Sequence, residues 1–394
     1  MEQPRDPMPS PLMGEPFLLT PGPLTTSAEV KQAMLRDWGS WDSAFRAMTR
    51  DMRRRLLRIA GDPDDCDCVP IQGSGSFCVE AMLGTFVPRN GKVLVLANGA
   101  YGLRAAKTMG YIGRAHTLIN KGDYLPPRGH DVSAALAADP AITHVLAIHC
   151  ETSSGILNPL AEIAEATEKA GRHLLVDSMS AFGAVALNMA ELPVQAMVSS
   201  ANKCIEGVPG FGFVIARKSA LMAAKGNAHS LSLDVHDQWS VFEDTGQWRF
   251  TPPTHAVAAF VTALDTFEAE GGRPARLARY CENRDRLVTG MRDLGFETLL
   301  DDAWQSPIIV TFFCPADPAF DFTRFYDEMK TRGFIIYPGK LTVVDSFRIG
   351  CIGRMDTGIM TRVIAAARDS LTAIGVTSAA PPAAAMAERA HLAA

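Results

Sequence analysis

Residues 197–213 read MVSSANKCIEGVPGFGF, and this stretch decides the fold because an apolar strand ends there in a lysine and a glycine-rich turn. Lys203 is the only basic residue of the stretch, and no acidic residue is nearer to it than Glu206. Burial at a strand end would lower the pKa of the lysine amine and free its lone pair for reaction with a carbonyl group. A lysine that extends from the strand end into solvent explains the same pattern equally well.

Several other apolar runs predict further strands of the same sheet. Helix-length segments such as 160–170 separate them, and runs this continuous are typical of strands that are buried on both faces. We therefore expect an α/β fold with a mostly parallel sheet covered by helices. The runs are 93–97, 144–150, 173–176, 196–199 and 213–216.

The length of 394 residues predicts two domains, because single hydrophobic cores stop growing at roughly 250 to 300 residues. From about residue 271 the pattern changes to a long charged helix and short strands, which is typical of an α+β layer. We expect a mobile N-terminal extension, a large domain, a small C-terminal domain and a disordered alanine- and proline-rich tail. Their predicted bounds are 1–17, 18–270, 271–375 and 376–394.

Composition argues against nucleic-acid and membrane partners. The net charge of −5 gives no basic face for nucleic acid, and apolar stretches such as 256–264 are shorter than the roughly 18 residues that a membrane span needs. The first residues show no basic segment followed by an apolar one, so we expect a cytoplasmic protein. The eight scattered cysteines predict reduced thiols and no metal site.

The segment 69–77, VPIQGSGSF, precedes a predicted helix over 78–86 and is a candidate phosphate-binding turn. Small residues let the backbone approach an anion, and the helix N-terminus offers unpaired amides. The motif lacks the lysine of a Walker sequence and the full dinucleotide-binding fingerprint. By itself, a glycine- and serine-rich turn before a helix is a common structural feature.

Other polar groups follow the predicted strands, and ligands of parallel sheets collect at the carboxyl ends of strands. An aromatic residue, Tyr101, follows the first run, and Asp177 follows the third. Together with the phosphate-binding turn and Lys203, these residues form the set that a pyridoxal phosphate site needs. Asp177 would keep the pyridine nitrogen protonated, while Lys203 would bind the cofactor and move the proton. Singly, Asp177 would be a helix cap and Tyr101 a core aromatic.

At these residues the sequence resembles the class V aminotransferases of pyridoxal phosphate fold type I, over about residues 18–371. The resemblance rests on 19–23 (LTPGP), on 151–155 (ETSSG) and on the spacing between Asp177 and Lys203. It implies a large domain with a sheet of seven strands, a smaller C-terminal domain and a homodimer.

The resemblance also implies the roles of individual residues. Arg348 would hold the substrate anion, and Thr251 would reach the phosphate of the neighbouring subunit's cofactor. Tyr101 would stack on the cofactor ring, and Thr152 would bond its hydroxyl group. The residues that would bind the cofactor phosphate are Ser74, Gly75, Ser76 and Ser200.

Within this family, four segments are most similar to members that transfer an amino group from 2-aminoethylphosphonate to pyruvate, so we expect these two small molecules as substrates. Ser76 departs from the family pattern, which commonly has threonine there, and Ser178 and Ala181 stand where alanine and serine are common. The segments are 37–42 (DWGSWD), 149–152 (HCET), 201–213 and 347–353 (FRIGCIG).

Three other readings stay open. Alanine:glyoxylate or serine:pyruvate exchange would use the same fold and cofactor. A lyase of the cysteine desulfurase type needs a nucleophilic cysteine and usually a histidine before the lysine, where this chain has Asn202. A non-catalytic nucleotide-binding module could use residues 73–76 alone.

Overall fold

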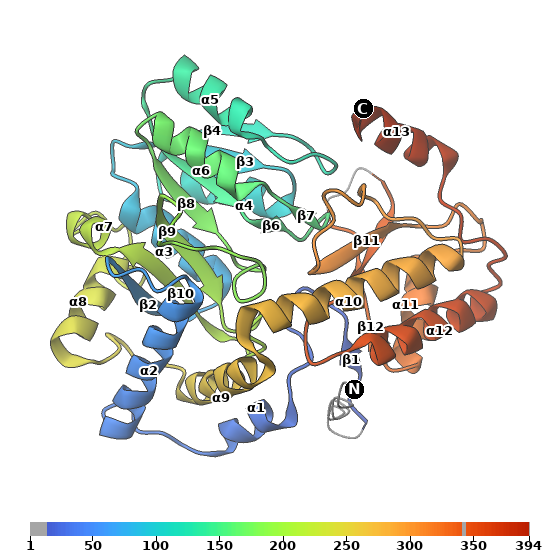
Figure 1. The fold of residues 1–394 in the computed structure, drawn as a ribbon, viewed down its shortest axis with the longest axis horizontal. Coiled ribbons are helices and arrows are strands. Elements are labelled where there is room, and N and C mark those ends of the chain that lie inside the picture. Colours follow the sequence, from blue (N-terminus) through green and yellow to red (C-terminus); the bar gives the residue numbers. More distant parts are fainter. Residues whose placement is uncertain (1–13, 341–343, 394) are drawn as a thin grey trace, which may run out of the picture.

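The computed structural model describes residues 14–340 and 344–393 (Figure 1). A large part contains the main sheet and a smaller part contains the C-terminal elements, with α10 (Gly272–Asp293) running from one to the other (Figure 1). Residues 1–13 of the predicted extension lie outside the described residues.

The main sheet has seven strands in the order β2-β10-β9-β8-β5-β3-β4. Neighbouring strands are parallel from β9 through β4, whereas β10 is antiparallel to both β9 and β2. The predicted mostly parallel sheet is therefore confirmed. The strands are β2 (Cys66–Gly73), β3 (Lys92–Ala97), β4 (Ala115–Asn120), β5 (Ile142–Ile148), β8 (His173–Asp177), β9 (Val194–Ser200) and β10 (Gly210–Arg217).

Two strands of this sheet, β2 and β4, were missed because neither is an uninterrupted apolar run. Both are edge strands, and β4 reads AHTLIN with no fully buried residue. β2 contains Pro70, which an edge strand tolerates because it need not donate to a neighbour on its open side.

Helices cover the sheet and form one continuous core with it. α3 contacts β9 and β10, α4 contacts β3, and α6 contacts β8. Each of these helices thus packs on the sheet near a strand that it connects. The other helices of this part contact β2, β10 or one another. The helices of the large part are α1 (Ala28–Gln32), η1 (Ala33–Leu35), α2 (Ser43–Ile59), α3 (Gly75–Phe86), α4 (Ala100–Tyr111), α5 (Gly129–Ala138), α6 (Leu160–Lys169), α7 (Lys218–Ala223), α8 (Val235–Thr245) and α9 (Thr254–Glu270).

The small part is built on a three-stranded antiparallel sheet in the order β11-β14-β13. Its core also takes in Phe17 and Leu19, because β1 pairs in parallel with β12. The segment that precedes α1 therefore packs with the C-terminal elements, although the sequence places it next to the large domain. The elements are β1 (Phe17–Leu18), β11 (Ile309–Phe313), α11 (Phe322–Thr331), β12 (Phe334–Ile335), β13 (Tyr337–Pro338), β14 (Ser346–Gly350) and α12 (Thr357–Ile374).

The C-terminal segment differs from the expected disordered tail. It contains the helix α13 (Ala383–Ala393), which packs Ala385 and Met386 against Tyr124, Leu299 and Phe313. Alanine has the highest helix propensity, so this composition favours a helix once an apolar surface is present to receive it.

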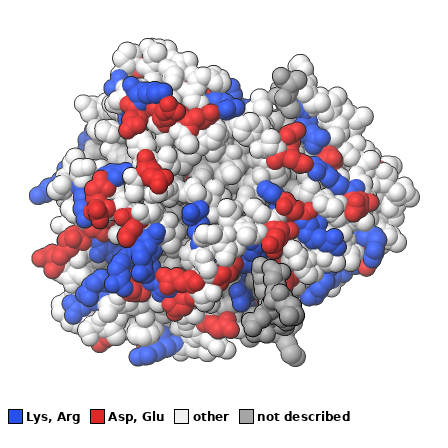
Figure 2. Space-filling model, viewed as in Figure 1, with Lys and Arg blue, Asp and Glu red and all other residues white. Residues whose placement is uncertain are grey.

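Charged side chains of both signs are intermixed on the face that Figure 2 shows. Basic side chains gather there over α2, and acidic side chains border them (Figure 2). Beneath this surface, Arg55 of α2 is buried and pairs with Asp265 at 2.8 Å and with Glu268 at 2.8 Å. Within residues 14–340 and 344–393, no helix is both long and apolar enough to cross a membrane.

Candidate active site

The predicted site residues gather where β8 and β9 end and where α3 and α4 begin. A cavity of ≈ 240 Å³ lies between these elements. Its walls include Gly75, Ser76, Tyr101, Arg104, Asp177 and Met179. Four of these residues were singled out from the sequence, and strand ends and helix N-termini bring them together as expected.

Lys203 lies in the turn that follows β9. The turn is closed by hydrogen bonds from the Glu206 amide to the Lys203 carbonyl, 2.7 Å, and from the Gly207 amide to the Ala201 carbonyl, 3.0 Å. The Lys203 amine points inward and donates to the Pro21 carbonyl at 2.6 Å. A Cβ atom on Gly22, whose φ is +118°, would lie 2.8 Å from this amine, so only glycine leaves room for it.

The surroundings of Lys203 favour the uncharged amine. Burial lowers the pKa of Lys203, and the positive charge of Lys340 lowers it further, although Tyr101, Cys204 and Asp177 act in the opposite direction. A lysine that extends into solvent is therefore the wrong alternative for this position. The amine is available as a nucleophile and as a base.

Asp177 is the last residue of β8, and its side chain is buried. Its Oδ1 accepts a hydrogen bond from the Met179 amide at 3.0 Å. Among the described residues, no lysine, arginine or histidine lies within ion-pairing distance of it, and burial raises its pKa to about 6. A buried carboxylate without a cation is costly, so this position suits a ligand that brings a positive charge or a donated proton.

Tyr101 lies in the first turn of α4, between two cations. The Arg104 guanidinium carbon lies 4.9 Å from the ring centroid, and the Lys340 amine lies 4.6 Å from it. The backbone under Tyr101 is held by Glu151, whose Oε2 accepts from the amides of Tyr101 at 2.9 Å and Gly102 at 3.4 Å. Glu151 thus caps the helix that orients the aromatic ring.

Sequence reasoning assigned no role to Glu151 or to the neighbouring His149. Glu151 is fully buried, and burial raises its pKa. His149 Nδ1 lies 3.0 Å from Ser178 Oγ, and its amide donates to the Asp177 carbonyl at 2.8 Å. Burial lowers the pKa of His149 to about 4, so the ring is neutral at physiological pH. The sequence feature that could have indicated a role for both residues is the run of ionisable residues directly after an apolar strand.

The candidate phosphate-binding residues begin α3. Ser74 precedes the helix in an extended conformation, and its side chain makes no capping hydrogen bond. The first amides of a helix have no partner inside it and point toward the space before its N-terminus. A Cβ atom on Gly75 would lie 2.3 Å from the sulfur of Met179, so any larger residue would have to displace this flexible side chain. Arg104 Nη1 donates to Ser76 Oγ at 3.4 Å.

Arg348 lies on β14 of the small part and is buried. Its Nη1 donates to the Thr152 carbonyl at 2.9 Å, and its Nε donates to the Pro338 carbonyl at 3.0 Å. Within the described part of the chain, no carboxylate pairs with it. Burial lowers its pKa, although nearby Tyr101, Tyr337 and Glu151 favour the charged form. The guanidinium therefore retains a positive charge that these residues leave unneutralised.

Six expected residues are not among the cavity walls, namely Ser74, Thr152, Ser200, Lys203, Thr251 and Arg348. Ser200 and Thr251 have other partners. The hydroxyl of the buried Ser200 bonds to Asn202 Oδ1 at 3.1 Å. Thr251 is exposed, and its carbonyl accepts from Gln72 Nε2 at 3.2 Å. The single chain thus does not bring the Thr251 side chain to the cavity.

The cysteines near the site do not fit nucleophilic catalysis. Burial raises the pKa of Cys150 and Cys351 to about 12 and raises that of Cys204 still further. Inert, buried thiols of this kind argue against the desulfurase-type alternative.

The chain is similar to known aminotransferases over nearly its whole length. The family model described as Aminotransferase class-V matches residues 119–331. The chain is 69% identical to the 2-aminoethylphosphonate–pyruvate transaminase of Rhizobium meliloti (strain 1021), covering 97% of this chain and 100% of that protein. It is 67% identical to 2-aminoethylphosphonate–pyruvate transaminase 1 of Paraburkholderia xenovorans (strain LB400), covering 97% and 99%.

Solved structures share the fold at lower identity. Pyridoxamine–pyruvate aminotransferase from Mesorhizobium loti superposes with a TM-score of 0.83 at 21% identity, covering 98% of each chain. Alanine–glyoxylate aminotransferase from Nostoc sp. gives a TM-score of 0.84 at 21% identity, covering 94% of this chain and 98% of that one. The family model and the near-full-length relatives show that the chain belongs to the class V aminotransferase family.

Proposed function

We propose that this protein is a pyridoxal phosphate-dependent enzyme that transfers the amino group of 2-aminoethylphosphonate to pyruvate, giving phosphonoacetaldehyde and alanine. The observation that carries the proposal is the pair of near-full-length relatives, 69% and 67% identical, that are named for this reaction. The buried Arg348 supports it, because both substrates are anions and this guanidinium has no carboxylate partner among the described residues.

The residues at the cavity fit pyridoxal phosphate. Asp177 is a buried carboxylate without a cation, which suits a protonated ring nitrogen. The first amides of α3, with Ser74, Gly75 and Ser76, suit a phosphate group. When bound, this cofactor supplies an electron sink for negative charge that develops on the substrate carbon.

The side chains of the chain itself would act on this group and on the substrate. Lys203 would hold the cofactor covalently and, as a free amine, would move a proton at the substrate carbon that bears the amino group. Asp177 keeps the proton on the ring nitrogen. Tyr101 would cover one face of the ring, and Thr152 would bond the ring hydroxyl. Arg348 binds the phosphonate in one half-reaction and the carboxylate in the other, because its planar fork matches both groups.

We infer that the enzyme acts as a homodimer in the cytoplasm. Two exposed apolar side chains next to expected site residues support a second copy there: Phe77, which follows Ser76, is 50% exposed, and Phe250, which precedes Thr251, is 42% exposed. Thr251, next to Phe250, would then reach the partner's cofactor phosphate, together with Ser200 on its own chain. Eight free cysteines fit a reducing compartment.

An amino-donor panel tests the proposed function. With pyruvate as acceptor, 2-aminoethylphosphonate should give a kcat/KM at least about a hundredfold above that of serine. Alanine is left out as a donor here, because its exchange with pyruvate regenerates the same two molecules. With 2-aminoethylphosphonate as donor, pyruvate should likewise give a far higher kcat/KM than glyoxylate as acceptor. A preference for alanine with glyoxylate, or for serine with pyruvate, would contradict the proposal and favour the other exchanges of this family.

Arg348 variants locate the anion site in the same assay. Loss of a charge-assisted hydrogen bond costs about 3 kcal/mol, so Arg348→Ala should lose about a hundredfold in kcat/KM for both substrates. Arg348→Lys should recover only part of this loss, because a point charge cannot make a two-pronged bond. Wild-type values in a fully cofactor-loaded Arg348→Ala protein would place the anion site elsewhere.

A further inference from the structure

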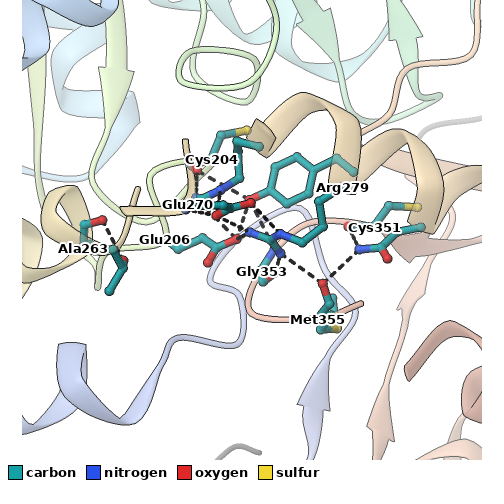
Figure 3. Close-up of polar contacts among 12 residues, drawn as sticks. Cys204, Glu206, Ala263, Glu270, Arg279, Cys351, Gly353 and Met355 are labelled. Carbon is teal, nitrogen blue, oxygen red and sulfur yellow. Dashed lines mark hydrogen bonds and ion pairs between the residues drawn. The ribbon is translucent and has the colours of Figure 1, made fainter. Parts of the chain in front are cut away.

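A buried ionic cluster joins Glu206, in the turn that follows Lys203, to Glu270 and to residues of α10 (Figure 3). Glu206 Oε1 accepts from Arg279 Nη2 at 2.8 Å and from the Tyr280 hydroxyl at 2.6 Å, and it lies 3.4 Å from Arg276 Nη1. Glu270 accepts from the Nε atoms of Arg276 and Arg279, each at 2.8 Å. We refer to Glu206, Glu270, Arg276, Arg279 and Tyr280 as the lysine-turn cluster.

The cluster balances two negative with two positive charges away from solvent. Burial alone would raise the pKa of Glu206, but Arg276 and Arg279 hold it at about 2. Buried ion pairs contribute little net stability compared with apolar packing of the same volume. The cluster is therefore better explained by the backbone geometry that it fixes than by a contribution to the free energy of unfolding.

The first thing that the cluster fixes is the backbone after the lysine. Glu206 has a φ of +64°, in the left-handed region that favours glycine, and its side chain is held there by the two arginines and Tyr280. The Cys204 carbonyl accepts from Arg276 Nη1 and, at 3.4 Å, from the Tyr280 hydroxyl. The residue that follows Lys203 is thus bound by α10.

The second thing that it fixes is the segment after the strand of Arg348. Arg279 Nη1 donates to the carbonyls of Gly353 at 2.6 Å and Met355 at 3.0 Å. One helical turn further along α10, Asn283 Nδ2 donates to the Cys351 carbonyl at 3.1 Å. This segment directly continues β14, so a single guanidinium bonds both to the lysine turn and to the loop next to Arg348 (Figure 3).

We propose that Arg279, acting with Glu206 and Arg276, is a positioning residue that fixes the separation between the Lys203 amine and the Arg348 guanidinium. The inference rests on the proposed function, because that function requires the amine and the anion site to act on one substrate molecule. Arg279 contacts neither the cavity nor a reacting atom; it acts through the two backbone segments that it joins. A small displacement of either segment would weaken both binding and reaction.

The first test compares Arg279→Gln with Arg292→Gln in the full-length protein. Arg292 lies on the same helix, but its ion pairs with Glu297 and Asp302 are at the surface of the small part. Hydrogen exchange should show that the amides of 204–207 and 351–355 lose protection together in Arg279→Gln and keep it in Arg292→Gln. Unchanged exchange in either of the two segments of Arg279→Gln would overturn the proposal.

The second test is kinetic. Arg279→Gln should raise KM for both 2-aminoethylphosphonate and pyruvate by about tenfold or more at full cofactor loading, whereas Arg292→Gln should match the wild type. In an Arg348→Lys background, Arg279→Gln should raise KM by a clearly smaller factor than in the wild type. The reason is that the effects of two residues that act through one another are not additive. A double variant whose KM change equals the product of the two single changes would overturn the proposal.

Two milder variants keep the proposal testable if Arg279→Gln fails to fold. Arg279→Lys and Tyr280→Phe should each give the same paired loss of protection, to a smaller extent. Hydrogen exchange needs no substrate, so the expected loss of protection does not depend on which amino donor the enzyme uses. Unchanged exchange, in contrast, would reject the positioning role even in an enzyme that is active on 2-aminoethylphosphonate.

Discussion

Asp177 shows that a residue suited to bind a ligand can destabilise the chain that carries it. Its carboxylate is buried at the end of β8 with one backbone hydrogen bond and no cation at ion-pairing distance among the described residues. The folded protein therefore binds a proton at this position more tightly than the unfolded chain does. Stability is lost as the pH rises from about 4 through about 6, the range over which only the unfolded chain has released this proton.

In the cofactor-free protein, Asp177→Asn should therefore be more stable than the wild type at pH 8, by up to about 3 kcal/mol. The amide keeps the hydrogen bond from Met179 and carries no charge. Below pH 4 the difference should disappear, because the wild-type carboxyl is then protonated as well. Urea unfolding at both pH values measures this, with the exposed Asp244→Asn as control. A wild type that is equally or more stable at pH 8 would contradict the prediction.

The sequence predicted those site residues that follow an apolar strand or begin a helix, namely Lys203, Asp177, Tyr101 and the turn at 74–76. Glu151 could not be assigned in this way, because the amides that it caps are about 50 residues away in the chain. Glu206 was noticed only as the nearest acid to Lys203. Its arginine partners lie 70 and 73 residues away, on a helix that was predicted without its orientation.

At the scale of elements, strands and helices with strong periodicity were predictable, and those that depend on a neighbour were not. β4 has no buried residue and is a strand because β3 pairs with it along its whole length. α13 is a helix of small residues whose position is set by contacts with Tyr124, Leu299 and Phe313. Local sequence does not contain that information, because the receiving surface comes from distant segments.

Removal of residues 381–394 should destabilise the protein by roughly 2 to 4 kcal/mol, because it uncovers this apolar surface and breaks the hydrogen bond from Arg389 to the Thr298 carbonyl. Turnover should stay close to that of the full-length enzyme at 25 °C, since α13 carries no site residue. Met386→Ala should reproduce part of the loss, and the exposed Glu388→Ala should not. Denaturant unfolding of the wild type, the truncated chain and the two point variants measures these stabilities, and parallel rate assays measure turnover. A truncated chain of unchanged stability would show that α13 does not pack as described.

At the scale of the whole molecule, one expected site residue, Thr251, is exposed on the surface of the single chain. Thr251 is exposed beside Phe250, away from the residues that line the site. A two-fold dimer would bring the same segment of a second copy to each site, since such interfaces place one surface against itself. The oligomer is therefore part of the proposed active site.

Mixing two inactive variants tests this arrangement. Thr251→Asp should repel the partner's cofactor phosphate, and Lys203→Ala removes the covalent anchor. When the two chains are unfolded and refolded together, half of the dimers should be hybrids with one intact site, and activity should recover to about a quarter of the wild-type value. Absence of recovery from refolded dimers, or a fully active monomer in sedimentation, would contradict the shared site.

The proposed chemistry requires that Lys203 carries the cofactor, and chemical labelling identifies that lysine. Borohydride reduction of the purified, cofactor-loaded enzyme, followed by peptide mass analysis, should find the added mass of the reduced cofactor on Lys203. Pretreatment with 2-aminoethylphosphonate should prevent this labelling, because the donor's amine displaces the Lys203 amine from the cofactor, whereas pretreatment with serine should leave it unchanged. A label on another lysine such as Lys340, or protection by serine but not by 2-aminoethylphosphonate, would contradict the account.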